Sequence, residues 1–185
     1  DGANHQGVLA FAAAHEYVSV SDILDYAKSL DEPPFIVIAE GLKDPHNLGS
    51  IIRTANAAGV HGVIIPKNRS VGLSETVAKV SAGAVEYTKV ARVTNISSVI
   101  ETLKENGLWI VGTALEGSTT HYKCDLKGAL AIVIGSEGEG LSRIVRERCD
   151  FLVKIPMLGK IESLNASVAA GVLIYEAVRQ RSGDK

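Results

Sequence analysis

Short runs of apolar, mostly β-branched residues alternate with amphipathic stretches over most of this chain. The apolar runs predict strands over 35–40, 62–66, 88–93, 108–114, 129–135 and 151–156. The stretches between them predict helices over 46–58, 74–84, 95–106, 140–148 and 164–181. Continuous apolar strands separated by helices are typical of a parallel sheet that is covered on both faces. The pattern therefore predicts an α/β domain with a mostly parallel sheet of about six strands and helices on both faces.

The helix expected over 46–58 has clear boundary residues at both ends. Asp44 before Pro45 fits an N-cap followed by a proline at the first helical position, and Gly59 fits a helix end. Apolar residues recur at helical spacing and predict a stripe that faces the core: Leu48, Ile51, Ile52 and Ala55. Arg53 falls on a different, polar face, beside Gly49.

Residues 1–33 differ from the rest of the chain. The tandem prolines within 31–34 mark a linker, because a residue before a proline is pushed out of the helical region. A short helix is expected before this linker, from Ser21 to Leu30, with Ser21 or Asp22 as its cap. We therefore divide the chain into a linker with a short helix (1–33) and an α/β domain (34–185).

The helix expected over 164–181 is rich in small residues, which allow another element to approach closely. They are Ala166, Ser167, Ala169, Ala170, Gly171 and Ala177. The apolar residues of this helix cover more than one stripe, so burial on two sides is expected. A homodimer interface is one explanation and tight packing within the chain is the other. Ser163 is the expected N-cap, and Asn165 could also cap this helix.

The composition narrows the class of protein. The chain has 185 residues, 46% hydrophobic and 22% charged, which fits one ordinary domain with a sizeable core and excludes disordered and fibrous classes. The longest uncharged stretch near the C-terminus, 163–175, is shorter than the ~20 residues of a membrane helix. Cys124, Cys149 and five scattered histidines show no metal-binding or redox spacing. We therefore expect no metal, no membrane contact and a cytoplasmic location.

The net charge of −2 conceals an uneven distribution along the chain. Residues 1–42 carry one basic and seven acidic side chains, whereas residues 43–92 carry seven basic and three acidic ones. The remaining residues balance at eleven of each. An anionic partner would therefore meet the 43–92 stretch first, although a solvated helix face explains the same charges.

Four junctions between a strand and a helix are the places where a ligand is expected. Ligands of open parallel sheets bind beyond the carboxyl ends of the strands. The junctions lie at 44–49, 113–117, 135–140 and 155–159, and the last continues to 163–167.

The junction at 135–140 is rich in glycine but does not match a phosphate-binding loop. Its glycines, at 135, 138 and 140, miss the G-x-G-x-x-G spacing, and no Gly-Lys-Ser/Thr follows. Glu137 and Glu139 would place negative charge where a phosphate must sit. A ligand with an adenosine-like body, a positive charge and no phosphate fits better, and S-adenosylmethionine is such a molecule. Tight turns in a crowded loop are the alternative explanation of the glycines.

Polar residues at these junctions carry the possible chemistry. Arg53 could contact a phosphate or a ribose, for which a planar guanidinium is suited, or it could be an ordinary surface arginine. Asn47 could be only a cap or turn residue, and Ser163 or Asn165 only a helix cap. Their shared position at strand ends of one sheet favours a common site.

Three segments, taken together and in order, resemble the signature motifs of the SpoU/TrmH family of SPOUT-class RNA ribose 2′-O-methyltransferases. They are 47–55 (NLGSIIRTA), 132–141 (IVIGSEGEGL), and 155–157 (IPM) continuing to 163–167 (SLNAS). The resemblance runs from about residue 34 to residue 181. Residues 5–8 (HQGV) also resemble the junction that follows a small RNA-binding domain in RlmB-type enzymes, which methylate a guanosine ribose of 23S ribosomal RNA. The resemblance thus makes residues 1–33 the remainder of a linker to such a domain.

The resemblance implies a fold, an activity and partners. It implies a trefoil knot in the C-terminal part, a homodimer, and S-adenosylmethionine-dependent methylation of a ribose 2′-hydroxyl in RNA, with ribosomal RNA as the expected target. A ribose methyltransferase of the same family that acts on tRNA, or that confers resistance by modifying ribosomal RNA, is one alternative. A non-catalytic RNA-binding module is another.

The resemblance also implies site residues. Contacts to S-adenosylmethionine are expected from Thr113, Leu115, Ile134, Gly135, Ile155, Met157 and Leu164. The positions that match the family's catalytic residues are Asn47, Arg53, Glu137, Ser163 and Asn165. Arg53 matches the family's candidate activator of the hydroxyl. Because arginine stays protonated in proteins, we expect it to hold an RNA phosphate and polarise the hydroxyl, while Glu137, Ser163 and Asn165 orient the reacting groups.

Overall fold

Seven parallel strands form one sheet in the order β3-β2-β1-β6-β4-β7-β5. The computed structural model describes residues 15–114 and 118–182. The strands are β1 (Phe35–Ala39), β2 (Gly62–Pro66), β3 (Val90–Val93), β4 (Trp109–Thr113), β5 (Thr119–Thr120), β6 (Leu130–Ile134) and β7 (Phe151–Lys154). Each neighbouring pair is parallel, which confirms the predicted sheet.

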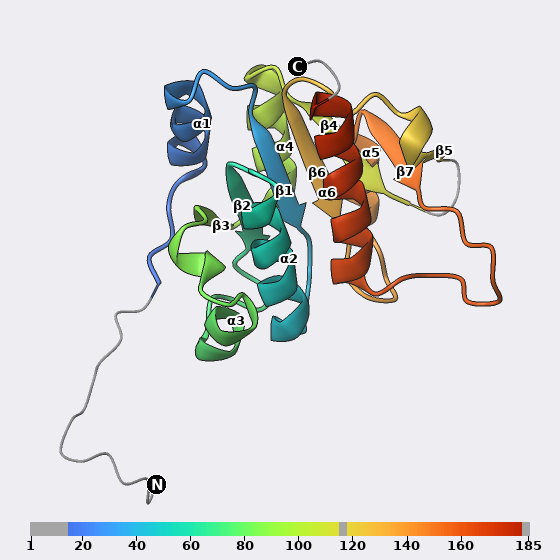
Figure 1. Cartoon of the computed structure of the whole chain (residues 1–185), viewed down its shortest axis with the longest axis horizontal. Coiled ribbons are helices and arrows are strands. Elements are labelled where there is room, and N and C mark those ends of the chain that lie inside the picture. Colours follow the sequence, from blue (N-terminus) through green and yellow to red (C-terminus); the bar gives the residue numbers. More distant parts are fainter. Residues whose placement is uncertain (1–14, 115–117, 183–185) are drawn as a thin grey trace, which may run out of the picture.

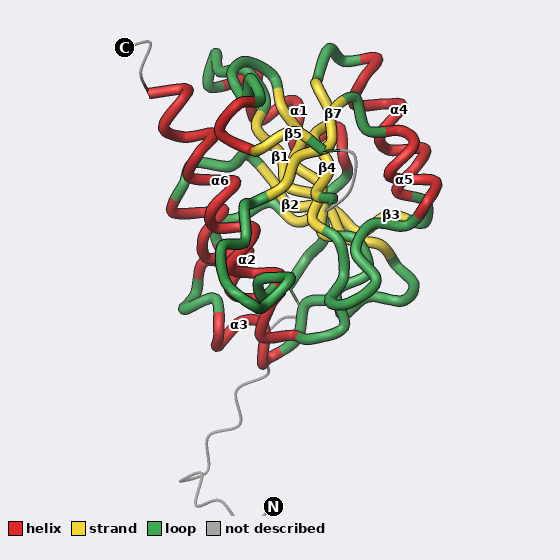
Figure 2. The backbone as a smooth tube through the Cα atoms, turned by 90° about the vertical axis from the view of Figure 1, so that its right-hand side faces the viewer, coloured by secondary structure: helices red, strands yellow, loops and turns green. Residues whose placement is uncertain are grey.

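Helices cover both faces of the sheet, as the sequence predicts (Figures 1 and 2). One face is covered by α2 (Pro45–Ala57), α3 (Glu75–Val80), the 3-10 turn η1 (Ala84–Glu86) and α6 (Ala166–Ser182). The other is covered by α1 (Val20–Ser29), α4 (Ile96–Glu105) and α5 (Arg143–Arg148). A second 3-10 turn, η2 (His121–Lys123), follows β5.

The two central strands, β1 and β6, divide the core into two apolar layers. All five residues of each strand are buried. Because successive side chains of a strand point to opposite faces, Val37 packs in the layer beneath α2 and α6, whereas Ile36 packs in the layer beneath α4. The pairing runs from Phe35–Leu130 to Ala39–Ile134, so β1 and β6 end side by side.

Helix α2 follows the sequence prediction closely. The Asp44 side chain accepts a hydrogen bond from the His46 N–H (2.8 Å), and Pro45 is the first helical residue. The predicted core stripe is fully buried: Leu48, Ile51, Ile52 and Ala55. Gly59, with φ of +70°, follows the helix end. The first turn of this helix therefore lies at the carboxyl end of β1.

Two other helices begin where the sequence prediction did not place them. Ser19, not Ser21 or Asp22, caps α1, and Asp22 completes the capping box by accepting from the Ser19 N–H (2.8 Å). Helix α5 begins at Arg143 rather than at residue 140. The preceding loop delays it, because Gly138 and Gly140 adopt positive φ angles, which a right-handed helix does not allow.

The start of α6 also differs from the prediction. The helix begins at Ala166, and the expected N-cap, Ser163, lies outside it. The Asn165 side-chain oxygen takes the capping role, because it accepts hydrogen bonds from the N–H groups of Ser167 (2.9 Å) and Val168 (3.3 Å). The two-residue strand β5 was not predicted, and the helix expected over 74–84 is divided into α3 and η1.

Within this chain α6 is buried along one stripe, whereas burial on two sides was expected. Ala170, Leu173, Ile174 and Ala177 are buried in the α2 layer of the core. On the other side of the helix Val168 and Tyr175 are 51% and 50% exposed. Inside one chain, therefore, the apolar residues of α6 are only partly covered.

The N-terminal segment packs against the α/β domain as far as it is described. Ile23 of α1 is fully buried and lies against Gly62, and Val18 forms a parallel bridge with Ala91. The described residues contain no helix long and apolar enough to cross a membrane. The HQGV junction at 5–8 lies outside the described residues, and the trefoil knot stays a prediction.

Candidate functional site

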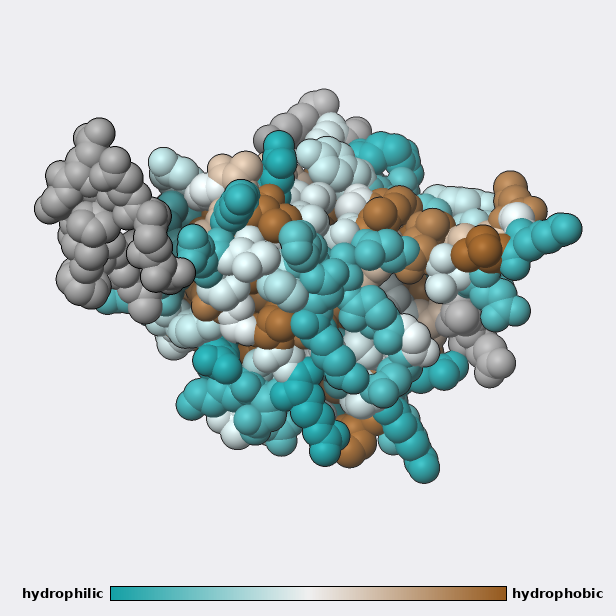
Figure 3. All heavy atoms as spheres, turned by 90° about the horizontal axis from the view of Figure 1, so that it is seen from below, coloured by the Kyte–Doolittle hydropathy of each residue, from teal (hydrophilic) through white to brown (hydrophobic). Residues whose placement is uncertain are grey.

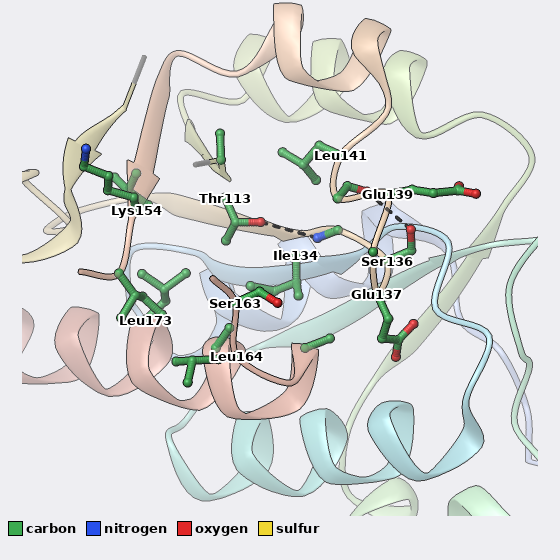
Figure 4. Close-up of a pocket in the computed structure, with 18 of the residues that line it drawn as sticks. Thr113, Ile134, Ser136, Glu137, Glu139, Leu141, Lys154, Ser163, Leu164 and Leu173 are labelled. Atoms are coloured by element: carbon green, nitrogen blue, oxygen red, sulfur yellow. Dashed lines mark hydrogen bonds between the residues drawn. The ribbon is translucent and has the colours of Figure 1, made fainter. Parts of the chain in front are cut away.

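A cavity of about 470 Å³ lies at the carboxyl ends of β4, β6 and β7 (Figure 4). This volume falls within the ~300–1,000 Å³ typical of small-molecule sites. Its walls come from the end of β4, the loop after β6, the segment after β7, and α6. Apolar walls are formed by Ile134, Leu141, Ile155, Met157, Leu164 and Leu173. The site thus lies at the edge of the sheet where the sequence predicted a ligand.

The loop from Ser136 to Gly140 closes on itself beside the cavity. The Ser136 N–H donates to the Gly140 carbonyl (3.1 Å), and the Gly140 N–H donates to the Ser136 carbonyl (3.0 Å). A Cβ atom on Gly135 would lie 2.3 Å from the Gly140 carbonyl carbon and 2.5 Å from the Leu141 nitrogen. Only glycine fits at position 135, so the tight turn requires this glycine, and the turn itself forms a wall of the cavity.

Thr113 connects the end of β4 to this loop. Its hydroxyl donates to the Val133 carbonyl (3.3 Å) and accepts from the Gly135 N–H (3.4 Å) (Figure 4). On the other side of the loop, the Glu40 carboxylate accepts from the Ser142 N–H (3.1 Å) and hydroxyl (2.6 Å). The loop is therefore held on one side by Thr113 of β4 and on the other by Glu40, the residue after β1.

A chain of hydrogen bonds through Asn47 joins three segments that are distant in sequence. The Asn47 side-chain amide, which is 5% exposed, donates to the Glu137 carboxylate. The Asn165 amide donates to the Asn47 side-chain oxygen (2.9 Å), while the Asn165 oxygen caps α6. Asn47 thus orients the Glu137 carboxylate and ties the starts of α2 and α6 to the glycine loop. Glu137 points from the loop toward α2 (Figure 4).

Both signs of charge line the cavity. Glu137, Glu139 and Glu162 are acidic, and Arg146 and Lys154 are basic. Two carboxylates on the glycine loop disfavour a phosphate there and favour a cationic group. Among the described residues, no cluster of His, Cys, Asp or Glu side chains could hold a metal ion.

The structure brings most of the predicted site residues to this cavity. Six of the seven residues expected to contact a cofactor line it: Thr113, Ile134, Gly135, Ile155, Met157 and Leu164. The seventh, Leu115, lies outside the described residues. Glu137 and Ser163 also line the cavity, and Asn47 and Asn165 join Glu137 through the hydrogen bonds above.

Arg53 does not line the cavity. It is exposed on α2, six residues after Asn47, and no hydrogen bond or ion pair is recorded for it among the described residues. Its guanidinium is therefore available to a partner outside this chain.

The sequence analysis did not predict several lining residues as part of the site: Arg146, Lys154, Glu162, Ala169 and Leu173. Lys154 ends a strand, so the strand-end rule could have identified it. Arg146 and Leu173 lie inside helices whose approach to the cavity depends on tertiary packing.

Comparison with known proteins identifies the class. The sequence model of the SpoU rRNA Methylase family matches residues 34–175, about three quarters of the chain. The chain therefore belongs to the SpoU rRNA methylase family.

Two relatives and three solved structures illustrate the similarity. YacO of Bacillus subtilis, assigned by name to the TrmH family of tRNA/rRNA methyltransferases, is 54% identical over 178 residues, which are 96% of this chain and 72% of YacO. A Staphylococcus saprophyticus protein, also named as a TrmH family tRNA/rRNA methyltransferase, is 55% identical over 183 residues. These are 98% of this chain and 74% of that protein.

The SpoU methyltransferase AviRb of Streptomyces viridochromogenes, solved with AdoMet, has a TM-score of 0.77 at 33% identity over 82% of this chain and 62% of AviRb. An AdoMet-bound rRNA methyltransferase of Sinorhizobium meliloti has a TM-score of 0.79 at 30% identity over 89% of this chain and 61% of its own. The A. aeolicus TrmH/SpoU tRNA modifying enzyme has a TM-score of 0.76 at 29% identity over 89% of this chain and 84% of its own. This chain thus spans about three fifths of the two AdoMet-bound proteins.

Proposed function

We propose that this chain transfers a methyl group from S-adenosylmethionine to a ribose 2′-hydroxyl of RNA, with a guanosine of 23S ribosomal RNA as the target. The observation that carries this proposal is the hydrogen-bonded chain Glu137–Asn47–Asn165, which unites the three family motifs beside one cavity. Two structural neighbours were solved with AdoMet, which supports the same cofactor here.

The chemistry of the cavity suits S-adenosylmethionine. Apolar side chains such as Ile134, Ile155 and Leu164 can enclose an adenosine, and the bare backbone at Gly135 allows a ligand to approach closely. The acidic glycine loop favours the positive sulfonium. When bound, the cofactor supplies an activated methyl group.

The residues of this chain supply mainly position and charge to the transfer. Thr113 and the Gly135 backbone fix the loop that shapes the donor site, and Asn47 holds the Glu137 carboxylate in one orientation. Proper orientation of two reactants is itself a large part of catalysis. Ser163 lines the cavity, where its hydroxyl can orient the ribose. Arg53, exposed beside this region, is assigned to holding an RNA phosphate and polarising the attacking hydroxyl.

A homodimer is part of the proposal. The segment between β7 and α6 carries Leu158 and Ile161 at 98% and 71% exposure, and α6 adds Val168 and Tyr175. Large exposed apolar side chains on adjoining elements favour an interface with a second copy. We also assign the protein to the cytoplasm, where its RNA target would be met.

A tRNA target is the second candidate. It is favoured by the likeness to the A. aeolicus tRNA modifying enzyme, and the relatives' names include both tRNA and rRNA. A non-catalytic RNA-binding module is the third, and the intact cavity speaks against it.

The test is transfer of labelled methyl groups from S-adenosylmethionine to ribosomal and transfer RNA by the wild-type chain and by Arg53→Ala. We expect label on the 2′-oxygen of one ribosomal guanosine. Arg53→Ala should bind the cofactor with unchanged heat in calorimetry but lose at least ~100-fold in transfer, the size of effect typical of a positioned catalytic group. If the wild type binds the cofactor but transfers no methyl group, the proposed methyltransferase activity is refuted. Near-normal turnover by Arg53→Ala would refute the proposed role of Arg53.

A further inference from the structure

Four basic side chains gather at the carboxyl ends of the three strands next to the cavity. Lys43 follows β1, Lys67 and Arg69 follow β2, and Arg92 lies near the end of β3. All four are exposed. The strands are parallel neighbours in the order β3-β2-β1-β6. These side chains therefore lie at the carboxyl ends of the strands, on the same side of the sheet as the cavity loop after β6. We call these four residues the strand-end basic patch.

Backbone contacts fix the patch and place it against the cavity rim. The Lys67 N–H donates to the Val93 carbonyl (2.7 Å), and the Val71 N–H donates to the Leu42 carbonyl (2.9 Å). A Cβ at Gly41 would lie 3.6 Å from Ser136 Cβ and 3.9 Å from the Arg69 carbonyl oxygen. The turn that bears Arg69 therefore adjoins the cavity loop. From β1 to β3 the patch extends over two strand spacings, about 10 Å.

The charges of the patch are not neutralised by carboxylates. No ion pair is recorded for any of the four residues within the described part of the chain. Arg92 donates to the Lys67 carbonyl (3.1 Å) and lies 5.5 Å from the Tyr17 ring centroid. The nearby carboxylates Glu40 and Asp44 accept hydrogen bonds from Ser142 and from the His46 N–H.

Four basic residues elsewhere are held in ion pairs. Lys104 pairs with Asp150, Arg143 with Glu147, Arg148 with Glu101, and Arg179 with Glu176. The four cations of the strand-end basic patch have no such partner among the described residues and lie together at the carboxyl ends of neighbouring strands. Seen from the side where the strands end, hydrophilic side chains gather over this face (Figure 3).

We propose that the strand-end basic patch binds the phosphate backbone of the RNA on its way to the cavity. This proposal rests on the proposed function, in which RNA is the substrate. It places the RNA backbone along the carboxyl ends of β1, β2 and β3. Contacts of lysine and arginine with phosphates position a nucleic acid without reading its sequence. The patch should therefore contribute affinity for any RNA, and other residues should determine which RNA is the target.

The test is the salt dependence of RNA binding by the triple variant Lys43→Gln/Lys67→Gln/Arg69→Gln. Arg92 is left in place because its guanidinium also holds the Lys67 carbonyl and stacks on Tyr17. The matched control, Lys28→Gln/Lys123→Gln/Arg143→Gln, removes the same charge from exposed positions elsewhere. Dissociation constants are measured by filter binding between 50 and 300 mM salt, with 23S ribosomal RNA and bulk tRNA as probes.

Each phosphate contact on a single strand contributes about 0.7 to the slope of log K against log salt concentration. The triple variant should therefore lower the slope by about 2, which raises Kd by roughly 100-fold at 0.1 M salt. The loss should be equal for both RNAs, and the control should change the slope much less.

Two further measurements show whether the triple variant is folded, and the outcomes distinguish failure of the patch from failure of the proposed methyltransferase. An unchanged heat of S-adenosylmethionine binding and an unchanged melting temperature show that the triple variant is folded. If wild type and triple variant bind RNA with the same slope, or if the control loses as much, the patch is not the RNA surface, whatever the methyl-transfer assay gives. If the slope falls as expected but the wild type transfers no methyl group, the patch stands and the proposed enzyme fails.

Discussion

At the scale of single residues, the site depends on one position where no side chain fits. Gly135 is buried, and the backbone of Gly140 and Leu141 passes where its Cβ would be. The displaced atoms would be main chain, which has no alternative rotamer. A single methyl group therefore has to open the Ser136–Gly140 turn, and that turn is a wall of the cavity.

The variant Gly135→Ala should therefore damage the site as well as the fold. We expect a loss of unfolding free energy of about 1–3 kcal/mol, as in other overpacked cores, together with a loss of at least ~10-fold in affinity for S-adenosylmethionine. Urea unfolding and calorimetry measure the two effects. Gly159→Ala is the control, because a Cβ there meets nothing within 4 Å and the position has no positive φ. Normal cofactor affinity in Gly135→Ala would show that the turn does not shape the site.

Sequence patterns predicted the residues that need only local information. Asp44 and Pro45 define the start of α2 through local contacts alone, because the Asp44 side chain accepts from the His46 N–H two residues later. The hydrogen bonds from Asn47 to Glu137 and from Asn165 to Asn47 bridge 90 and 118 residues, and no spacing in the chain indicates them. The family resemblance named these residues, but only the fold shows how they meet.

At the scale of elements, strands were easier to predict than helix starts. Buried β-branched runs identify β1, β2 and β6, because burial on both faces demands apolar residues at every position. The two-residue β5 carries no such run and exists only through its pairing with β7. The start of α5 depends on the glycine loop, and α6 begins two residues later than expected because Asn165 caps it.

The junction of α5 and β7 contains a partly buried thiol with an altered pKa. Cys149 directly follows α5, its thiol donates to the Val145 carbonyl (3.3 Å), and a Cβ on Gly112 would lie 2.6 Å from its Sγ. Burial raises the pKa of the Cys149 thiol from 9.0 to about 12. The thiol therefore stays protonated in the folded chain at neutral and moderately alkaline pH.

This raised pKa predicts a loss of stability at high pH. The unfolded thiol ionises near pH 9 and the folded one near 12, so between these values the unfolded state holds fewer protons and is favoured as pH rises. We expect the wild type to lose up to about 1.4 kcal/mol of unfolding free energy per pH unit relative to Cys149→Ala between pH 9 and 11. Urea unfolding at pH 7, 9, 10 and 11 gives the comparison. The same pH dependence of unfolding free energy in both proteins would contradict a partly buried thiol that stays protonated.

At the scale of the whole molecule, the parallel sheet brings segments that are distant in sequence close together in space. Strands β4, β6 and β7 end on the same side of the sheet, so their ends and the segments that follow β6 and β7 enclose a single cavity, and Asn47 after β1 joins it through Glu137. The same side of the sheet carries the strand-end basic patch, which places the proposed donor site and the proposed RNA path side by side. Arg53 of α2 is exposed and lies outside the cavity lining.

Hydrogen–deuterium exchange with and without S-adenosylmethionine tests this convergence most directly. We expect the cofactor to slow amide exchange together in 134–141, in 155–165 and in the first turn of α2, while α1 and α4 stay unchanged. Protection limited to one of the three segments, or located away from the carboxyl edge of the sheet, would contradict the claim that they form one methyl-donor site.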